Sequence, residues 1–268
     1  MWGGSGRTRT RQEKRVKLTI CHLYPDLMNI YGDRGNIIAL SRRATWAGLD
    51  VEVRRVDLGE RPDLRTFDIL FIGGGQDAQQ ALVARDLAEV KGPSLRAAVD
   101  DGLVVLAICG GYQLLGRYFH TGSGAMLPGA EVFDACTVAG SRRCIGDVIV
   151  RSQIDGQAHT LVGFENHSGK TYLGARTRPL GHVLVGSGNN GEDGSEGATD
   201  RNAFGTYLHG SLLPKNPWLT DLLIRRAVER RYGPATSLPP VDDGPERQAH
   251  EAILARIRAR GRVDSGVI

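Results

Sequence analysis

The chain has little of several features that mark specialised classes of protein. Aromatic residues make up 6% of its 268 residues, while the hydrophobic share of 41% and the charged share of 24% are ordinary for globular domains. The longest clean apolar run, Leu103–Cys109, has the length of a strand and is far short of the ~20 residues that a membrane-spanning helix needs. Composition therefore excludes a coiled coil, a collagen-like chain and wholesale disorder, and we expect no transmembrane segment.

Cysteine is also scarce. The four cysteines form no Cys-x-x-Cys pair and have no histidine at zinc-finger spacing; they are Cys21, Cys109, Cys136 and Cys144. We therefore expect no structural zinc and no other metal site. The N-terminal segment lacks the apolar core of a secretory signal, so we expect a cytoplasmic chain with free thiols, one of which is available for chemistry.

An excess of positive charge is confined to one end of the chain. The net charge is +4, and residues 1–17 alone hold six basic residues against one acidic residue. The remainder is close to neutral, which argues against a nucleic-acid-binding surface. We predict a disordered basic arm over residues 1–16, one folded domain over 17–232, and a linker with a C-terminal helix over 233–268.

Short β-rich runs alternate with helical segments in the first half of the chain. Strands are predicted at 17–24, 50–56, 67–72 and 103–108, and helices at 33–48, 78–90, 93–101 and 110–118. This alternation predicts an α/β fold with a doubly wound, mostly parallel sheet, whose site lies at the carboxyl ends of the strands. After residue 130, short pieces predict added antiparallel strands at 132–138, 147–152, 160–165, 182–186 and 204–208. We also expect a mobile loop at 186–200 and helices at 217–232 and 245–260.

The most informative segment is Ile108–Leu114, where a buried strand must turn sharply into a helix. Cys109 occupies the turn and is followed by Gly110 and Gly111, whose small size lets the backbone pass closely. A helix N-terminus favours a thiolate, which is the attacking form of cysteine. An inert buried cysteine would not explain the two glycines, so Cys109 is predicted to be a nucleophile.

Such a thiol needs a base and an oxyanion hole. His209 is the best candidate base among the seven histidines, because the segment Phe204–Gly210 ends a predicted strand at a glycine. Gly73–Gly75 closes another strand, and its backbone amides could approach an oxyanion closely.

These residues together resemble the class I (triad-type) glutamine amidotransferases, in the cobyric-acid-synthase-like (CobB/CobQ-like) branch. The resemblance covers about residues 17–232 and is carried, in order, by Gly73–Gly75, Ile108–Gln113, Gly163–Gly169 and Gly205–Gly210. Further segments are similar to the glutaminase subunits of this branch that work with a cell-wall ligase; they are Asn29–Leu40, Gly146–Val148 and Leu213–Pro217.

The resemblance implies a function and partners. It implies that the chain hydrolyses L-glutamine and passes ammonia, as a heterodimer, to a MurT-like Mur ligase subunit. That partner would amidate the D-glutamate α-carboxylate of lipid II in peptidoglycan synthesis at the inner face of the membrane. The chain has no Gly-x-x-x-x-Gly-Lys-Ser/Thr loop, so we expect no cofactor in it, and ATP and Mg on the partner.

The resemblance also assigns roles to residues. Cys109 would attack the side-chain amide of glutamine, His209 would relay protons, and Gly74 or Gly75 with Gly110 would form the oxyanion hole. Gln113 would face the bound glutamine. Arg143, or its neighbour Arg142 if the register differs by one, would hold the α-carboxylate of glutamine.

One position departs from the family pattern. Class I enzymes usually place the third triad member two residues after the histidine, and here that residue is Ser211. Either the Cys109–His209 dyad suffices, or a carboxylate from elsewhere orients His209. Our candidate for that carboxylate is Glu165, which could instead be a loop residue or bind substrate.

Four alternatives remain. Hydrolases or chaperone-like proteins of the DJ-1/PfpI type carry histidine directly after the elbow cysteine, whereas this chain has Gly110. A γ-glutamyl hydrolase would share the thiol chemistry without an ammonia-consuming partner. A glutaminase for corrinoid amidation would share the whole site. A non-enzymatic scaffold with a dead site would not be expected to retain both Cys109 and His209.

Overall fold

The computed structural model describes residues 16–260, so almost all of the predicted basic arm lies outside the described residues. Its first sheet has the strand order β11-β12-β4-β3-β1-β2 and is parallel except for the pair β11–β12. The strands are β1 (Lys17–Leu23), β2 (Asp50–Val56), β3 (Ile69–Ile72), β4 (Val104–Ile108), β11 (Ala198–Asp200) and β12 (Ala203–Thr206). The predicted doubly wound α/β fold is confirmed.

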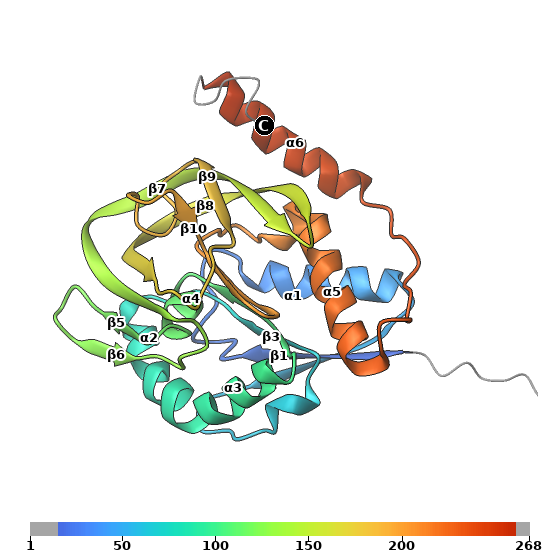
Figure 1. Ribbon diagram of the computed structural model, residues 1–268, viewed down its shortest axis with the longest axis horizontal. Helices are drawn as coiled ribbons and strands as arrows, with labels where there is room; N and C mark the ends of the chain where they lie inside the picture. Colours follow the sequence, from blue (N-terminus) through green and yellow to red (C-terminus); the bar gives the residue numbers. More distant parts are fainter. Residues whose placement is uncertain (1–15, 261–268) are drawn as a thin grey trace, which may run out of the picture.

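Helices cover both faces of this sheet, with α2 and α3 on one side and α1 and α5 on the other (Figure 1). They are α1 (Arg34–Trp46), α2 (Asp77–Arg85), α3 (Gly92–Asp100) and α5 (Pro217–Tyr232), with short helical turns η1 (Leu64–Thr66), η2 (Asp86–Lys91) and η3 (Leu213–Lys215). Strands β3 and β4 are buried at every residue, as expected for apolar runs packed between two helical layers.

A second sheet lies partly above the first and partly to its left in Figure 1. Its order is β10-β9-β7-β5-β6, with β8 paired to β7. The strands are β5 (Tyr118–His120), β6 (Met126–Pro128), β7 (Ala135–Ile154), β8 (Gln157–Leu173), β9 (Gly181–Val185) and β10 (Ser195–Glu196). Added antiparallel strands are therefore present, but they are not all short: β7 and β8 form one long hairpin.

The hairpin turn explains that difference. Asp155 and Gly156 both have positive φ, 53° and 76°, which matches the two-residue turn that joins long twisted strands. The predicted strand at 204–208 is instead part of the first sheet, where β12 pairs with β4 in parallel.

Two further expectations are wrong. The predicted helix at 110–118 is only α4 (Gly110–Leu114), because the chain must then pass the start of β7: a side chain at Gly116 would lie 2.8 Å from the carbonyl oxygen of Ala135. The expected mobile loop at 186–200 is an ordered segment. Asn189 is fully buried there, and its side-chain amide exchanges two hydrogen bonds of 2.9 Å with the backbone of Gly197.

The C-terminal helix α6 (Gly244–Ala259) follows a stretch without helix or strand at 233–243 and lies at the outer edge of the molecule (Figure 1). Leu254 and Ile257 join a small apolar cluster with residues of the second sheet. Asp147 on β7 accepts hydrogen bonds from Arg256 and Arg260. Within residues 16–260, no helix combines the length and the apolar character needed to cross a bilayer.

Candidate active site

Cys109 lies between β4 and α4 in a strained backbone conformation. Its φ of 48° and ψ of −105° lie outside the usual regions for a residue with a side chain, and the thiol-bearing residue is only 6% exposed. This is the sharp strand-to-helix turn that the sequence predicts. It holds the sulfur at the carboxyl edge of the parallel sheet, next to the first turn of α4.

The glycines after Cys109 allow the Gly73–Gly75 loop to approach. A side chain at Gly110 would lie 2.8 Å from the amide nitrogen of Gly75, and one at Gly111 would lie 2.7 Å from the carbonyl oxygen of Gly73. The amides of Gly75 and Gly110 therefore lie close together. Neither amide donates a backbone or side-chain hydrogen bond within residues 16–260, so both are available to an oxyanion.

Gly74 does not fit its predicted role in the oxyanion hole. Its amide donates a 2.7 Å hydrogen bond to Oδ2 of Asp33, which comes from the loop between β1 and α1. Because that donor is already used, Gly75 and Gly110 are the remaining pair.

Asp33 also faces the candidate base. Oδ1 of Asp33 lies 3.4 Å from Nδ1 of His209, and both side chains are almost completely buried. The ring of Tyr31 packs edge-on against the His209 ring, with centroids 5.0 Å apart. The Asp33 carboxylate thus connects the Gly73–Gly75 loop with the imidazole. The other ring nitrogen of His209, Nε2, has no hydrogen-bond partner among the described residues.

The surroundings of His209 favour its protonated form. Burial by itself would lower its pKa, but the negative charge of Cys109 and the hydrogen bond to Asp33 act in the opposite direction and raise the pKa to about 10. An imidazolium beside a cysteine sulfur is the arrangement that activates a thiol for attack.

Glu165, the sequence-based candidate for the third member, lies elsewhere. Its two carboxylate oxygens accept hydrogen bonds from the amides of Ser187 and Gly188, at 2.8 and 3.0 Å. Its carboxylate is thus committed to holding the 186–200 segment, and the carboxylate against His209 belongs to Asp33. Ser211, at the usual triad position, donates its hydroxyl to the carbonyl oxygen of Gly32 and so holds the loop that carries Asp33.

A cavity of about 490 Å³ opens beside Cys109. Gln113 lines it as expected, but both ends of its amide are used within the protein: it accepts from Gln80 and donates to the hydroxyl of Tyr207, each at 3.1 Å. We infer that Gln113 shapes the cavity wall.

Arg143 lies at the exposed side of this cavity, whereas Arg142 is not among its lining residues. The Arg143 guanidinium donates to Oδ1 of Asn166 at 2.6 Å and lies 3.5 Å from the hydroxyl of Tyr31. The register with Arg143 is therefore the one that the cavity favours. Asp77, at the start of α2, supplies an acidic side chain to the same lining.

Sequence reasoning missed Asp33 and Asp77. A usable signal for Asp33 was its place after β1, because parallel strands bring their carboxyl ends to one edge, where β4 and β12 also end. Asp77 follows β3 at the same edge.

In the part of the chain that the structure describes, no group of three or more His, Cys, Asp or Glu side chains is arranged to hold a metal ion.

Comparisons with known proteins agree with this geometry. The model of the CobB/CobQ-like glutamine amidotransferase domain matches residues 19–217. The chain is 43% identical over 240 residues to the lipid II isoglutaminyl synthase (glutamine-hydrolyzing) subunit GatD of Staphylococcus aureus, covering 90% of this chain and 96% of that protein. It is 42% identical over 228 residues to GatD of Streptococcus pneumoniae, covering 85% and 86%. Cobyric acid synthase of Limosilactobacillus reuteri is 30% identical over 212 residues, and the match spans 40% of that longer protein.

Solved structures support the fold. PurLQS of Thermotoga maritima is similar with a TM-score of 0.56 at 16% identity, covering 90% of this chain and all of that one. The glutaminase domain of Trypanosoma brucei CTPS has a TM-score of 0.53 at 10% identity, covering 83% and 96%. At these identities the likeness concerns the fold alone. The family matches over most of the length show that the chain belongs to the CobB/CobQ-like glutamine amidotransferases, and within them to the GatD subunits.

Proposed function

We propose that this chain is the glutaminase subunit of a lipid II isoglutaminyl synthase, which hydrolyses L-glutamine and delivers the ammonia to a MurT-type ligase. The observation that carries the chemistry is the arrangement of Cys109, His209 and Asp33 at one edge of the sheet, beside two free backbone amides. The acceptor, the D-glutamate α-carboxylate of lipid II, is proposed from the similarity to GatD.

The first half of the reaction forms a thioester. The sulfur of Cys109 attacks the side-chain amide carbon of glutamine, and the amides of Gly75 and Gly110 stabilise the negative charge that develops on the oxygen. The imidazolium of His209 donates its proton to the leaving nitrogen, so ammonia departs and the glutamyl group remains on sulfur. Asp33 keeps Nδ1 of His209 directed away from the reacting atoms, which leaves Nε2 for proton transfer.

The second half releases glutamate. His209, now neutral, accepts a proton from a water molecule, and the resulting hydroxide equivalent attacks the thioester carbon at the same pair of amides. The C–S bond breaks, the proton returns the cysteine–histidine pair to its starting state, and glutamate leaves. The balance is glutamine plus water to glutamate plus ammonia.

Two charged residues at the cavity fit the ends of the substrate. The guanidinium of Arg143 suits the α-carboxylate, and the carboxylate of Asp77 suits the α-ammonium group. Asn166 and Tyr31, which line the same cavity, hold the Arg143 side chain and leave other guanidinium N–H groups free to bind the ligand.

The partner supplies the chemistry that this chain does not contain. Amidating a carboxylate requires its activation, for which we propose ATP and Mg on the ligase subunit. The acceptor is lipid-linked, so the heterodimer would work in the cytoplasm at the inner face of the membrane. We assign no cofactor to this chain.

Reconstitution tests the proposal. The purified chain, a candidate Mur-ligase-like subunit, ATP, Mg, glutamine and lipid II are combined, and mass spectrometry follows replacement of one carboxylate by an amide. We expect amidation that requires Cys109 when glutamine is the nitrogen source, but not when free ammonia is supplied. Equal amidation from glutamine with Cys109→Ser, or amidation of a corrinoid by the native partner, would refute the assignment.

A further inference from the structure

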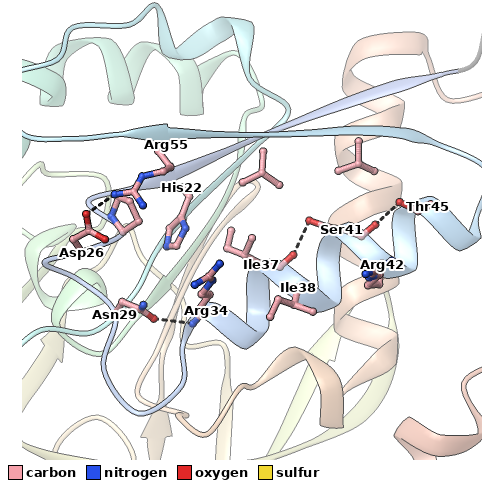
Figure 2. A pocket seen from close by; sticks show the side chains of 13 residues that line it. His22, Asp26, Asn29, Arg34, Ile37, Ile38, Ser41, Arg42, Thr45 and Arg55 are labelled. Carbon is pink, nitrogen blue, oxygen red and sulfur yellow. Dashed lines mark hydrogen bonds and ion pairs between the residues drawn. The ribbon is translucent and has the colours of Figure 1, made fainter.

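A second cavity lies between α1 and the edge strand β2, away from Cys109. It has a volume of about 650 Å³ and is lined from one face of α1, from alternate residues of β2, and from the loop after β1. Figure 2 shows that His22 points into it from β1, towards the side chain of Arg34 at the start of α1. None of the proposed glutaminase residues lines this cavity.

His22 is a buried polar side chain whose ring packs against Phe71 and which has no hydrogen-bond partner among the described residues. It is only 5% exposed, and neither ring nitrogen makes a hydrogen bond to any of the residues 16–260. Burial lowers its pKa to about 4, with the charges of Arg55 and Arg34 adding to that effect, so the ring is neutral near pH 7. A neutral imidazole can donate one hydrogen bond and accept another, so both ring nitrogens have unused hydrogen-bonding capacity, and only Nε2 is fully buried.

Positive charge in the cavity is also unpaired. The guanidinium groups of Arg34 and Arg42 form no ion pair and no hydrogen bond within the described chain, whereas Arg55 pairs with Asp26. Asp26 is the acidic residue of the lining, and that ion pair neutralises it. Ser41 and Thr45 donate their hydroxyls to the carbonyls of residues 37 and 41, along the helix (Figure 2). The net field in the cavity is therefore positive.

The wall between these charges is apolar. Ile37, Ile38, Val51 and Val53 line the middle of the cavity. Two of them are unusually open for apolar side chains, with 54% of Ile38 and 40% of Val53 exposed. A site of this kind combines a few polar groups that orient a ligand with an apolar surface that contributes contact area.

We propose that this cavity binds a small organic anion, whose phosphate or carboxylate group lies against His22 and Arg34 and whose apolar part lies against Ile38 and Val53. Phosphate and carboxylate are the chemistries that guanidinium groups recognise. Arg42 then lies near the opposite end of the ligand.

The site is connected to the proposed glutaminase centre by a single peptide bond. Arg34 directly follows Asp33, and its amide donates a 2.9 Å hydrogen bond to Oδ1 of Asn29, which also lines the cavity. A ligand that contacts Arg34 and Asn29 thus contacts both ends of the segment that carries Tyr31 and Asp33 against His209. Binding should therefore alter glutamine hydrolysis; this consequence, unlike the site itself, rests on the proposed function.

Calorimetry with defined probes tests the site. Phenyl phosphate and phenylacetate carry the two anionic groups on the same apolar ring, and inorganic phosphate lacks the ring. We expect at least one aromatic probe to bind once per chain with a dissociation constant below about 1 mM, and more tightly than inorganic phosphate. The preferred head group distinguishes a phosphorylated ligand from a carboxylate.

Variants locate the binding. Arg34→Gln removes the proposed anchor and Ile38→Glu places a negative charge on the exposed wall, so each should weaken binding about tenfold or more. Arg258→Gln, which removes an exposed arginine of α6, should leave the affinity unchanged. Arg143→Ala should also leave it unchanged, which excludes the glutamine cavity as the binding place. No saturable binding of either aromatic probe, or equal affinity in Arg34→Gln, would overturn the proposal.

Glutaminase assays test the connection separately. With the better probe at saturation, kcat or KM for glutamine should change at least twofold in the native chain and should not change in Arg34→Gln. Binding without any change in rate would refute the connection and leave the site standing. Absence of glutaminase activity from the native chain and its partner would refute the proposed function, while the calorimetric result would still decide the site.

Discussion

The two sides of the glutamine cavity are built differently. The side that would react lies at the carboxyl ends of the parallel strands, where Cys109, His209 and Asp33 are at most 6% exposed and Asp33 contacts both His209 and the backbone of Gly74. The side that would bind the substrate's charged end comes from β7 and the loop after β1, where Arg143 and Tyr31 are exposed. Chemistry thus depends on a buried set of groups with little freedom, while recognition depends on exposed groups that can be changed one at a time.

The largest effect is expected at the nucleophile. Cys109→Ser should lower glutamine hydrolysis by about 10⁴-fold or more with the fold intact, because a serine hydroxyl ionises far less readily than a thiol and is the weaker nucleophile. Steady-state release of glutamate measures it, and circular dichroism checks the fold. Cys136→Ser, at a partly exposed cysteine of β7, is the matched control and should retain activity. Residual hydrolysis near the native rate would rule out Cys109 as the nucleophile.

The next effect concerns Asp33. Asp33→Asn should lower kcat by about 10²- to 10⁴-fold with little change in KM, since an amide nitrogen facing Nδ1 would disfavour the tautomer that leaves Nε2 for proton transfer. Asn keeps the shape and can still accept from the amide of Gly74. A variant with normal kcat would show that the Cys109–His209 dyad suffices.

The pH dependence of stability sharpens the role of Asp33. The pKa of His209 is raised to about 10, above its unfolded value of about 6.5, so the stabilisation is complete below pH 6.5 and is lost as pH rises through 10. Asp33→Asn removes one of the groups that raise this pKa. Urea unfolding from pH 6 to 11 should therefore show the loss at a lower pH in the variant, and unchanged profiles would exclude a contribution of Asp33 to the pKa of His209.

A smaller effect is expected on the binding side. Arg143→Ala should raise KM for glutamine by the equivalent of about 1.5–3 kcal/mol with a smaller change in kcat, because a charged hydrogen bond to the α-carboxylate is lost. Arg142→Ala is the adjacent control and should behave like the native chain. If the two variants exchange their effects, the register of the carboxylate-binding arginine is off by one residue.

The same contrast explains what the sequence could predict. The elbow at Cys109 was predictable because its signals are local: a buried run, one cysteine and two glycines in succession. His209 was found only by pairing it with Cys109. The parallel sheet was predictable from the alternation of β-rich and helical segments, because the continuous apolar runs among them indicate strands that are buried on both faces.

Asp33 and the ordered 186–200 segment were not predictable in the same way. The contact between Asp33 and His209 joins residues 176 positions apart, and an aspartate at the start of a helix is equally typical of a capping residue. Much of the order of 186–200 comes from hydrogen bonds of the buried side chains of Asn189 and Glu165, because only the two short strands β10 and β11 at its end belong to the sheets. A composition rich in glycine and polar residues looks the same whether or not such partners exist.

The smallest effect is expected at Glu165. Glu165→Gln leaves one oxygen to accept from Ser187 or Gly188 and should lower the free energy of unfolding by about 1.5 kcal/mol, the loss of one charge-assisted hydrogen bond. Since this carboxylate does not face His209, kcat should change less than about threefold. In urea unfolding, the alkaline loss of stability should occur at the same pH as in the native chain. A shift of that loss to lower pH, as expected for Asp33→Asn, would instead return Glu165 to the position of third catalytic member and remove Asp33 from it.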